Sequence, residues 1–311
     1  MSCNLLAPRK FNAAVSAMRS FFQKKGFVEV HTQNALSILA ACEDPTTVAQ
    51  YNYEGNVWPL PQTGQMWLEH VLLDNPEFEG CFTVSTSYRN EENPVPGRHM
   101  RIFPMFEFES KGNMDDLIKL EKELLQHIGF EKSVFSDGNL VGNTKDYPVG
   151  ENLLDKLDLD YSTENTVDYP EGDYRDMMVK YNTDELDHDH EMQLKTDYGP
   201  VFFLKNFPYH TSPFWNMKKE GDTAAKVDVI LHGVETIGSA ERSCDKDDMR
   251  EQFLTISDGG YSGLLYDKFT KERVDKEMDE FLDRDFFPRY GGGIGISRMI
   301  SAMEQSNIID A

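Results

Sequence analysis

The first part of the chain carries a helical pattern of apolar residues followed by a strand pattern. Apolar residues recur every three or four positions from Phe11 to Phe22, which predicts a helix over 10–25 that ends at Gly26. Apolar and polar residues then alternate over 27–32 (FVEVHT), as they do in a half-buried strand. The chain therefore opens with a helix that leads into a sheet.

Two further strand patterns are separated by a segment rich in proline, asparagine and glycine. Residues 81–88 and 101–109 are the strands, and RNEENPVPGRH between them is typical of a loop. We expect an antiparallel hairpin with a long, charged connection. A helix follows over 113–128, with Asn113 as its candidate N-cap and leucines along one face.

The second half of the chain alternates between strands and helices. We expect strands over 201–208 and 227–235, a helix over 266–282, and a glycine turn over 289–295 before a last helix that begins near Ile296. Strands interrupted by helices, with a hairpin among them, favour an α+β fold with a mostly antiparallel sheet.

An acidic segment divides these two halves. Residues 151–190 contain thirteen Asp and Glu against three Lys and Arg, and apolar residues are sparse. This composition predicts a mobile acidic insertion or small subdomain, at about 134–199, that supplies no core element. We expect the rest of 1–311 to form a single domain.

Composition limits the classes of partner. Lys and Arg number 31 against 54 Asp and Glu, a formal charge of −23 over 311 residues. Such a chain is a poor ligand for nucleic acid and for anionic membranes. No apolar run is long enough to span a membrane, and the N-terminus lacks a signal-peptide pattern. Four scattered cysteines without a CxxC indicate reduced thiols, so we expect a cytoplasmic protein.

The predicted hairpin gathers cations and an aromatic ring around its loop. Arg89 and Glu91 share one face at the end of the first strand, and Arg98, His99 and Phe103 lie at the far end of the loop. Guanidinium groups suit phosphate oxygens, and a ring face suits a nucleobase. The simpler interpretation of these residues alone is a surface hairpin with ion pairs.

Two other segments carry candidate chemistry. A glycine run over 291–295 precedes Arg298, whose side chain is positioned to reach back toward a bound phosphate. Asp228 and Glu235 are candidates to share a hard cation, and Arg242 is a candidate to bind a carboxylate or carbonyl. Each of these features alone has an ordinary structural explanation, as a tight turn or a solvated carboxylate pair.

Together these segments resemble the class II aminoacyl-tRNA synthetases, and within them the aspartyl/asparaginyl subgroup. GFVEVHT resembles the end of motif 1, YRNEE with RH and Phe103 resembles motif 2, and GGGIGISR resembles motif 3. QTGQMWLE (62–69) resembles the amino-acid-binding segment of asparaginyl enzymes, and GVETIGSAER (233–242) resembles the metal and side-chain recognition segment. The resemblance covers roughly 10–110 and 200–305.

The resemblance implies a set of roles at an ATP site. Arg89 would bind the α-phosphate of ATP and Arg298 the γ-phosphate, and both are the candidate catalytic residues. Phe103 and Arg298 would sandwich adenine, while Glu91 would contact ATP from the purine side. The outer phosphates would meet Arg98 and His99.

The resemblance also implies an amino-acid site and a metal. Gln65 and Glu43 would hold the ammonium of the amino acid, Arg242 its distal polar group, and Glu69 would lie beside Arg242. The metal, Mg²⁺, would be held by Asp228 and Glu235. The reaction would be attack of a carboxylate on the α-phosphorus of ATP, giving an acyl-adenylate and pyrophosphate.

The chain also departs from the subgroup. The proline expected at the end of motif 1 is Gln33, and Asp44-Pro45 replace the glycines expected after Glu43. Motif 1 begins almost at the first residue, so we expect no anticodon-binding domain. With the acidic charge, this predicts that tRNA is an unlikely partner and that amino acid, ATP and possibly ammonia are the ligands of a homodimer.

Several functions remain open at this point. The main expectation is an aspartate–ammonia ligase, that is an asparagine synthetase, in which aspartate binds with its α-carboxylate on Arg242 and its ammonium near Glu69. The alternatives are a ligase that joins an amino acid to another amine or a protein, or residual asparaginyl-tRNA synthetase-like activity. A non-catalytic sensor is a further alternative, but Arg89, Glu235 and Arg298 argue against it.

Overall fold

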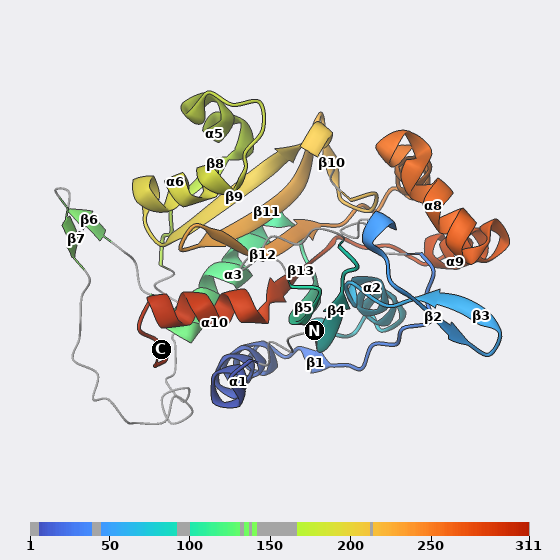
Figure 1. The fold of residues 1–311 in the computed structure, drawn as a ribbon, viewed down its shortest axis with the longest axis horizontal. Coiled ribbons are helices and arrows are strands. Elements are labelled where there is room, and N and C mark those ends of the chain that lie inside the picture. The colour runs from blue at the N-terminus through green and yellow to red at the C-terminus, as the bar shows by residue number, and fades with distance from the viewer. Residues whose placement is uncertain are drawn as a thin grey trace.

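The centre of the molecule is a nine-stranded sheet, in a computed structural model that describes residues 6–38, 45–91, 100–130, 134–136, 139–141, 167–211 and 214–310. Its order is β1-β4-β5-β13-β12-β11-β9-β8, with β10 paired to β11 (Figure 1). All pairings are antiparallel except β1–β4 and β8–β9 at the two edges. The strands are β1 (Val28–Glu29), β4 (Gly80–Tyr88), β5 (Ile102–Lys111), β8 (Glu171–Asp173), β9 (Val201–Pro208), β10 (Lys219–Glu220), β11 (Thr223–Leu231), β12 (Val234–Glu241) and β13 (Arg289–Gly295).

Three helices cover one face of the sheet and bury the main core. They are α1 (Pro8–Lys24), α3 (Met114–Ile128) and α10 (Ile296–Gln305). The ring of Phe22 in α1 lies 5.1 to 5.7 Å from the rings of Phe82, Phe106 and Phe108 on β4 and β5. This aromatic layer fixes the helices to the strands that carry the site. The fold is therefore α+β, with a mostly antiparallel sheet flanked by helices.

The remaining elements gather at the two ends of the sheet (Figure 1). Three helices pack around the fully buried Trp215 at one end, near α2 and a small hairpin, and two helices pack on β9 at the other end. The first group is α2 (Gln65–Asp74), β2 (Gln50–Tyr53), β3 (Asn56–Pro59), α7 (Lys246–Thr255), α8 (Gly260–Phe269) and α9 (Lys271–Leu282); the second is α5 (Tyr174–Tyr181) and α6 (His188–Tyr198). Short pieces complete the described chain: β6 (Val134–Ser136), β7 (Asn139–Val141), and the 3₁₀ turns Pro45–Thr47, Tyr209–Thr211 and Ile256–Gly259.

Several expectations from the sequence are confirmed. The hairpin of β4 and β5 is antiparallel, β9 and the start of α10 coincide with their expected positions, and Asn113 caps α3. The Asn113 side chain accepts from the backbone N–H groups of Asp115 and Asp116, and the Asp116 carboxylate accepts in return from the Asn113 N–H. Such a capping box satisfies N–H groups that have no partner inside the helix.

The glycine run over 289–295 is a strand rather than the expected turn. It forms β13, between β5 and β12 near the middle of the sheet. A Cβ at Gly291 would lie 2.0 Å from Oε1 of Glu109, and one at Gly292 would lie 2.6 Å from Cβ of Ser239. Glycine is required here because side chains of the neighbouring strands occupy the space on both faces of β13.

Two other predicted elements are each divided in the structure. The strand expected over 227–235 is a hairpin of β11 and β12, turned by His232 and Gly233, which have φ of 51° and 81°. Positive φ at both turn residues matches the right-handed twist of the strands. The helix expected over 266–282 is broken into α8 and α9 at Thr270, with φ of 70°. The strand expected over 27–32 is short, since β1 contains only two residues.

The described part of the acidic segment does supply core. Residues 167–199 contribute β8, α5 and α6, and β8 pairs in parallel with β9. Tyr174, Met177 and Leu194 are buried against Phe202 and Leu204 of β9. The expectation that this segment holds no core element is wrong here, because a few well-spaced apolar residues suffice to attach two short helices. Most of the segment before residue 167 lies outside the described residues.

Candidate active site

One row of residues across the sheet places two groups of charged side chains on the same face. Glu107 of β5 is opposite Gly293 of β13, which is opposite Gly238 of β12, which is opposite Asp228 of β11. Residues directly opposite each other project to the same face. Neighbouring strands are separated by about 4.8 Å, so the row spans roughly 14 Å. Its two glycines place no side chain of their own between an acid near α2 and an acid near α10, although Cε of Met105 lies 2.8 Å from where a Cβ on Gly293 would be.

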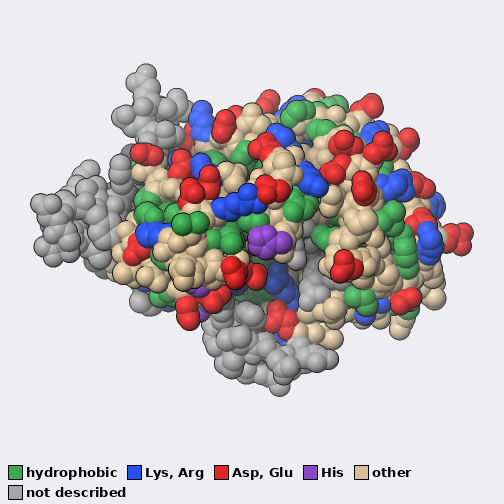
Figure 2. All heavy atoms as spheres, turned by 90° about the horizontal axis from the view of Figure 1, so that it is seen from above, with side chains coloured by type: hydrophobic (Ala, Val, Ile, Leu, Met, Phe, Trp, Pro, Cys, Tyr) green, Lys and Arg blue, Asp and Glu red, His purple; other side chains and the backbone are tan. Residues whose placement is uncertain are grey.

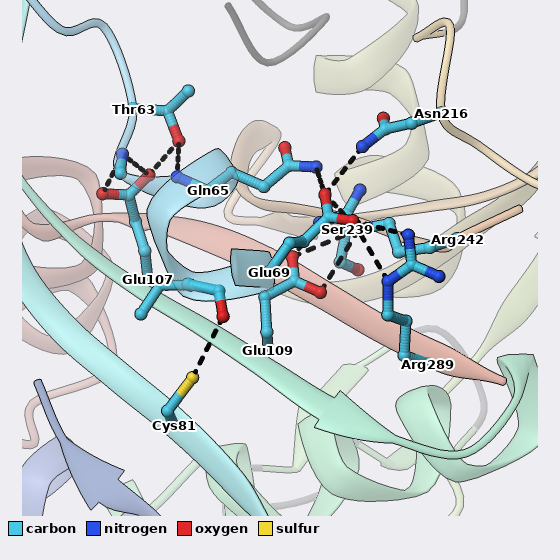
Figure 3. Close-up of polar contacts among 12 residues, drawn as sticks. Thr63, Gln65, Glu69, Cys81, Glu107, Glu109, Asn216, Ser239, Arg242 and Arg289 are labelled. Atoms are coloured by element: carbon cyan, nitrogen blue, oxygen red, sulfur yellow. Dashed lines mark hydrogen bonds and ion pairs between the residues drawn. The ribbon is translucent and has the colours of Figure 1, made fainter. Parts of the chain in front are cut away.

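The first group lies at the start of α2 and contains the predicted Gln65, Glu69 and Arg242 (Figure 3). Glu69 is fully buried, and Oε1 accepts from Nε2 of Gln65 at 2.9 Å and from Nδ2 of Asn216 at 2.7 Å. Oε2 accepts from Nε and Nη2 of Arg289 at 3.1 and 2.7 Å. The carboxylate of Glu69 therefore already receives four hydrogen bonds from the protein.

Arg242 is paired with a different acid of the same group. Its Nε donates to Oε1 of Glu109 at 3.1 Å, its Nη2 donates to the same oxygen at 2.5 Å, and its Nε lies 3.9 Å from Oε1 of Glu69. Burial raises the pKa of Glu109 to about 7 against the attraction of Arg242. Burial would also raise the pKa of Glu69, but Arg289 and Arg242 together hold it below its ordinary value. We infer that Glu69 is the permanent anion of this group.

The start of α2 is held in place by Glu107. Its carboxylate accepts from the backbone N–H of Gly64 at 2.9 Å and from the hydroxyl groups of Thr63 and Ser85. The Thr63 hydroxyl in turn accepts from the N–H of Gln65 at 3.0 Å. This network fixes the first turn of α2, and with it the side chains of Gln65 and Glu69, against β5.

The second group contains the residues expected to meet ATP. The guanidinium of Arg89 lies 5.4 Å from the ring centre of Phe103, and the buried Nε of Arg89 donates no hydrogen bond to any described residue. The backbones of Arg89 and Arg101 are hydrogen-bonded across the base of the hairpin, and the Arg101 side chain donates to the backbone carbonyl of Glu91. The structure thus brings Arg89 and Phe103 together, with Glu91 beside them.

Arg298 and the predicted metal ligands meet near the first turn of α10. Nη1 of Arg298 donates to the backbone carbonyl of Glu235 at 2.6 Å and lies 3.8 Å from its carboxylate. Asp228 is buried, with Nζ of Lys226 at 2.7 Å from Oδ2, while Oδ1 accepts no hydrogen bond from the described residues. Burial raises the pKa of Asp228 to about 7 against the opposing charge of Lys226.

The donor set around Gly238 fits a magnesium ion that also binds a substrate. A Cβ on Gly238 would lie 3.0 Å from Oε1 of Glu235 and 3.5 Å from Oδ1 of Asp228, so both oxygens face the same small space. Among the described residues no three His, Cys, Asp or Glu side chains form a fuller metal cluster. Mg²⁺ is commonly held by one or two carboxylates, with water and phosphate oxygens as its other ligands.

Three predicted site residues lie outside the described residues: Glu43, Arg98 and His99. Their assigned roles stay predictions. Sequence reasoning also missed members of the site, namely Glu109, Asn216, Lys226 and Arg289. Arg289 lies at the start of the segment expected to be a glycine turn, and a charged residue beside a glycine run was the available signal. Asn216 gave no signal, because it belongs to no recognised motif.

Comparisons with known proteins identify the family. The model of the family "tRNA synthetases class II (D, K and N)" matches residues 7–311, and the chain belongs to this family. An aspartate–tRNA(Asp) ligase of Pyrobaculum aerophilum is 23% identical over 304 residues, covering 96% of this chain and 64% of the relative. A lysine–tRNA ligase of Campylobacter jejuni subsp. doylei is 24% identical, covering 95% of this chain and 60% of the relative.

Solved structures share the fold. The asparaginyl-tRNA synthetase of Pyrococcus horikoshii complexed with asparaginyl-adenylate superposes with a TM-score of 0.69 at 19% identity, covering 96% of this chain and 64% of that one. The asparaginyl-tRNA synthetase of Entamoeba histolytica, also with asparaginyl-adenylate, gives a TM-score of 0.69 at 17% identity. The chain thus spans about 64% of the length of these proteins. No described helix combines the length and apolar character needed to cross a membrane.

Proposed function

We propose that this protein is an ATP-dependent, AMP-forming ligase that activates an aspartate- or asparagine-like amino acid as its acyl-adenylate. The observation that carries this proposal is the row from Glu107 through Gly293 and Gly238 to Asp228, which places a buried cluster of paired charges at α2 and the cations near Phe103 and α10 on one sheet face. A span of roughly 14 Å between the two ends suits an amino acid joined to a nucleotide.

The residues divide the reaction between them. At the nucleotide end, Arg89 and Arg298 offset the charge that develops on the phosphates, and Phe103 stacks on adenine. At the other end, Gln65 and Arg242 orient the amino acid so that its carboxylate meets the α-phosphorus in line. Guanidinium groups held in place and a positioned carboxylate nucleophile accelerate the formation of an adenylate without a covalent enzyme intermediate.

Asp228 and Glu235 would hold Mg²⁺ in this proposal. The bound metal would neutralise charge on the phosphates of ATP. In the absence of the metal, the ammonium group of Lys226 balances the charge of Asp228. Gly238 has no side chain, so the space in front of both carboxylates stays open.

The group that accepts the activated amino acid is the open part of the proposal. The relatives are tRNA ligases, which favours a synthetase-like transfer to tRNA. The formal charge of −23 supports a small acceptor such as ammonia, with asparagine as product. The face in Figure 2 has acidic and basic side chains intermixed, without a broad basic patch on that face.

We also infer a homodimer. Val28 in the edge strand β1 is 37% exposed. The outer edge of β1 has no partner strand among the described residues. An open edge is available to pair with another chain, and a second copy of β1 would cover it.

The decisive experiment is amino-acid-dependent exchange of pyrophosphate into ATP. Purified protein is assayed with aspartate and asparagine separately, each with and without ammonium and tRNA. Exchange with one of the two amino acids, lost in Arg89→Ala, supports the proposal. Absence of exchange with both, in protein shown to be folded, would refute it. Labelled ammonium appearing in asparagine would identify ammonia as the acceptor.

A further inference from the structure

Asn216 is held rigidly at the edge of the amino-acid pocket. It is fully buried between Trp215 and Met217, which are also fully buried. Its backbone carbonyl accepts from the N–H of Ser243 at 2.8 Å, and the next residue forms a β-bridge with Arg242. The side chain of Asn216 therefore has a fixed origin beside the predicted binding residue Arg242.

The contact with Glu69 fixes which way the Asn216 amide points. An ionised carboxylate can only accept hydrogen bonds, so the group that faces it at 2.7 Å must be the Nδ2 amide nitrogen. Arg289 and Arg242 keep Glu69 ionised. The same reasoning applies to Gln65, whose Nε2 donates to Glu69 at 2.9 Å. Glu69 thereby turns both amide oxygens away from itself.

The amide oxygen of Asn216 is left without a partner. Oδ1 is buried and accepts no hydrogen bond from any described residue. An unsatisfied buried acceptor destabilises a fold, so it calls for a ligand or an ordered water. Figure 3 shows this oxygen and the amide oxygen of Gln65 on the same side of Glu69. Two acceptors that face one side form a site for a group that only donates.

We propose that Oδ1 of Asn216 binds the ammonium group of the substrate amino acid, together with the amide oxygen of Gln65. A primary ammonium has three donors and no acceptor, which matches this set. Glu69 then acts as a positioning residue: its carboxylate orients both amides, while its oxygens remain occupied by Gln65, Asn216 and Arg289. This inference rests on the proposed function, since it assumes an amino acid as substrate.

The test compares an amino acid with the same molecule lacking its amino group. Binding of aspartate and of succinate, and of asparagine and of succinamate, is measured by calorimetry in wild type and in Asn216→Ala. A lost hydrogen bond to a charged group weakens binding by about tenfold to a hundredfold. We expect that loss for the amino acid and less than a twofold change for its analogue, with ATP affinity unchanged.

Two further variants keep the test decisive. Asn216→Ser retains a hydroxyl group and replaces the alanine variant if that variant folds poorly. It should also weaken binding of the amino acid more than binding of the analogue. Asn206→Gly is the matched control, because Nδ2 of Asn206 also donates to a carboxylate, that of Asp173, at 2.7 Å but outside the pocket. Its φ of 60° suits glycine. This control should bind all four ligands as wild type does.

The possible failures are distinct. If Asn216→Ala weakens the amino acid and its analogue by the same factor, the residue is only a scaffold or holds a water, and the inference is wrong. If wild-type protein binds neither aspartate nor asparagine, the proposed function fails, and the inference fails with it.

Discussion

The guanidinium of Arg289 donates two hydrogen bonds to a single carboxylate oxygen of Glu69, although 220 positions separate the two residues. Neither side chain is exposed, and the third nitrogen of Arg289 donates to the backbone carbonyl of Ser243 at 3.0 Å. The pair joins α2 to β13 and keeps Glu69 ionised within the proposed amino-acid site.

Removing one partner of this pair should destabilise the protein. Glu69→Gln leaves the buried charge of Arg289 without its counter-ion, so we expect a loss of about 3–5 kcal/mol in the free energy of unfolding. In the double variant with Arg289→Met the loss should be smaller than the sum of the two single losses. Urea unfolding of the four proteins measures this coupling, and strictly additive effects would show that the pair contributes no interaction energy.

Arg89→Ala and Arg298→Ala should each abolish adenylate formation while the protein stays folded. Each loses a group expected to stabilise phosphate charge in the transition state, which is worth at least about 2.7 kcal/mol, or a hundredfold in rate. Pyrophosphate exchange and thermal melting are measured together. Arg250→Ala removes an exposed ion pair with Asp279 and is the control. Near-normal exchange in either site variant would mean that the ATP site lies elsewhere.

Gly238→Ala should weaken the response to Mg²⁺. The added methyl group would press on Oε1 of Glu235 and occupy the space that this oxygen shares with Oδ1 of Asp228. We expect the Mg²⁺ concentration for half-maximal exchange to rise by about tenfold or more. Gly263→Ala is the matched control: it lies in α8 with open space around it, and alanine there favours the helix. An unchanged Mg²⁺ requirement in Gly238→Ala would remove these two carboxylates from the metal site.

The buried acid Glu121 should make stability depend on pH. Burial raises the pKa of this carboxyl, which accepts from the Ser239 hydroxyl at 2.7 Å, to about 8. Between about pH 4.5 and pH 8 the unfolded chain releases this proton and the folded chain keeps it, so the free energy of unfolding falls by up to about 5 kcal/mol as pH rises. Below about pH 4.5 both the folded and the unfolded chain hold the proton, so Glu121 adds no pH dependence to the free energy of unfolding there.

Glu121→Gln cannot titrate, so its unfolding free energy should fall less than that of wild type over this range. Urea unfolding at pH 5 and pH 8.5 without Mg²⁺ measures the difference. Glu280→Gln, on the exposed side of α9, should keep the wild-type dependence. Equal pH dependence in wild type and Glu121→Gln would show that the folded protein holds Glu121 ionised.

The acidic charge predicts weak binding of tRNA. With a formal charge of −23, association with a polyanion gains little from release of counter-ions. We expect no stable complex with total tRNA in gel-shift experiments at physiological salt. A stable complex would favour tRNA as the acceptor over ammonia and would direct attention to a local basic surface.

Local patterns predicted those parts of the fold and site that depend on neighbours in the chain. The cap at Asn113 and the pairing of β4 with β5 follow from short-range signals, and Arg89 and Phe103 meet because one hairpin carries both. Glu69 and Arg289 meet only after the sheet has formed, so no spacing in the sequence predicts their contact.

Two errors have different physical origins. Glycine has a low strand propensity, yet β13 needs glycine because Glu109 and Ser239 fill the space on its two faces, so tertiary packing determines this strand. His232-Gly233 forms a tight local turn, and the apolar residues on either side make the segment resemble one continuous strand.

The hairpin that joins Asp228 to Glu235 has a consequence for the order of folding. Its two-residue turn brings the two carboxylates proposed to hold Mg²⁺ together across a short loop, whereas Glu69 and Arg289 must close a loop of more than two hundred residues. The carboxylates can therefore be adjacent while the amino-acid pocket is still unformed. If these carboxylates hold Mg²⁺ as proposed, a nascent or partly unfolded chain would bind divalent cations before it could bind an amino acid.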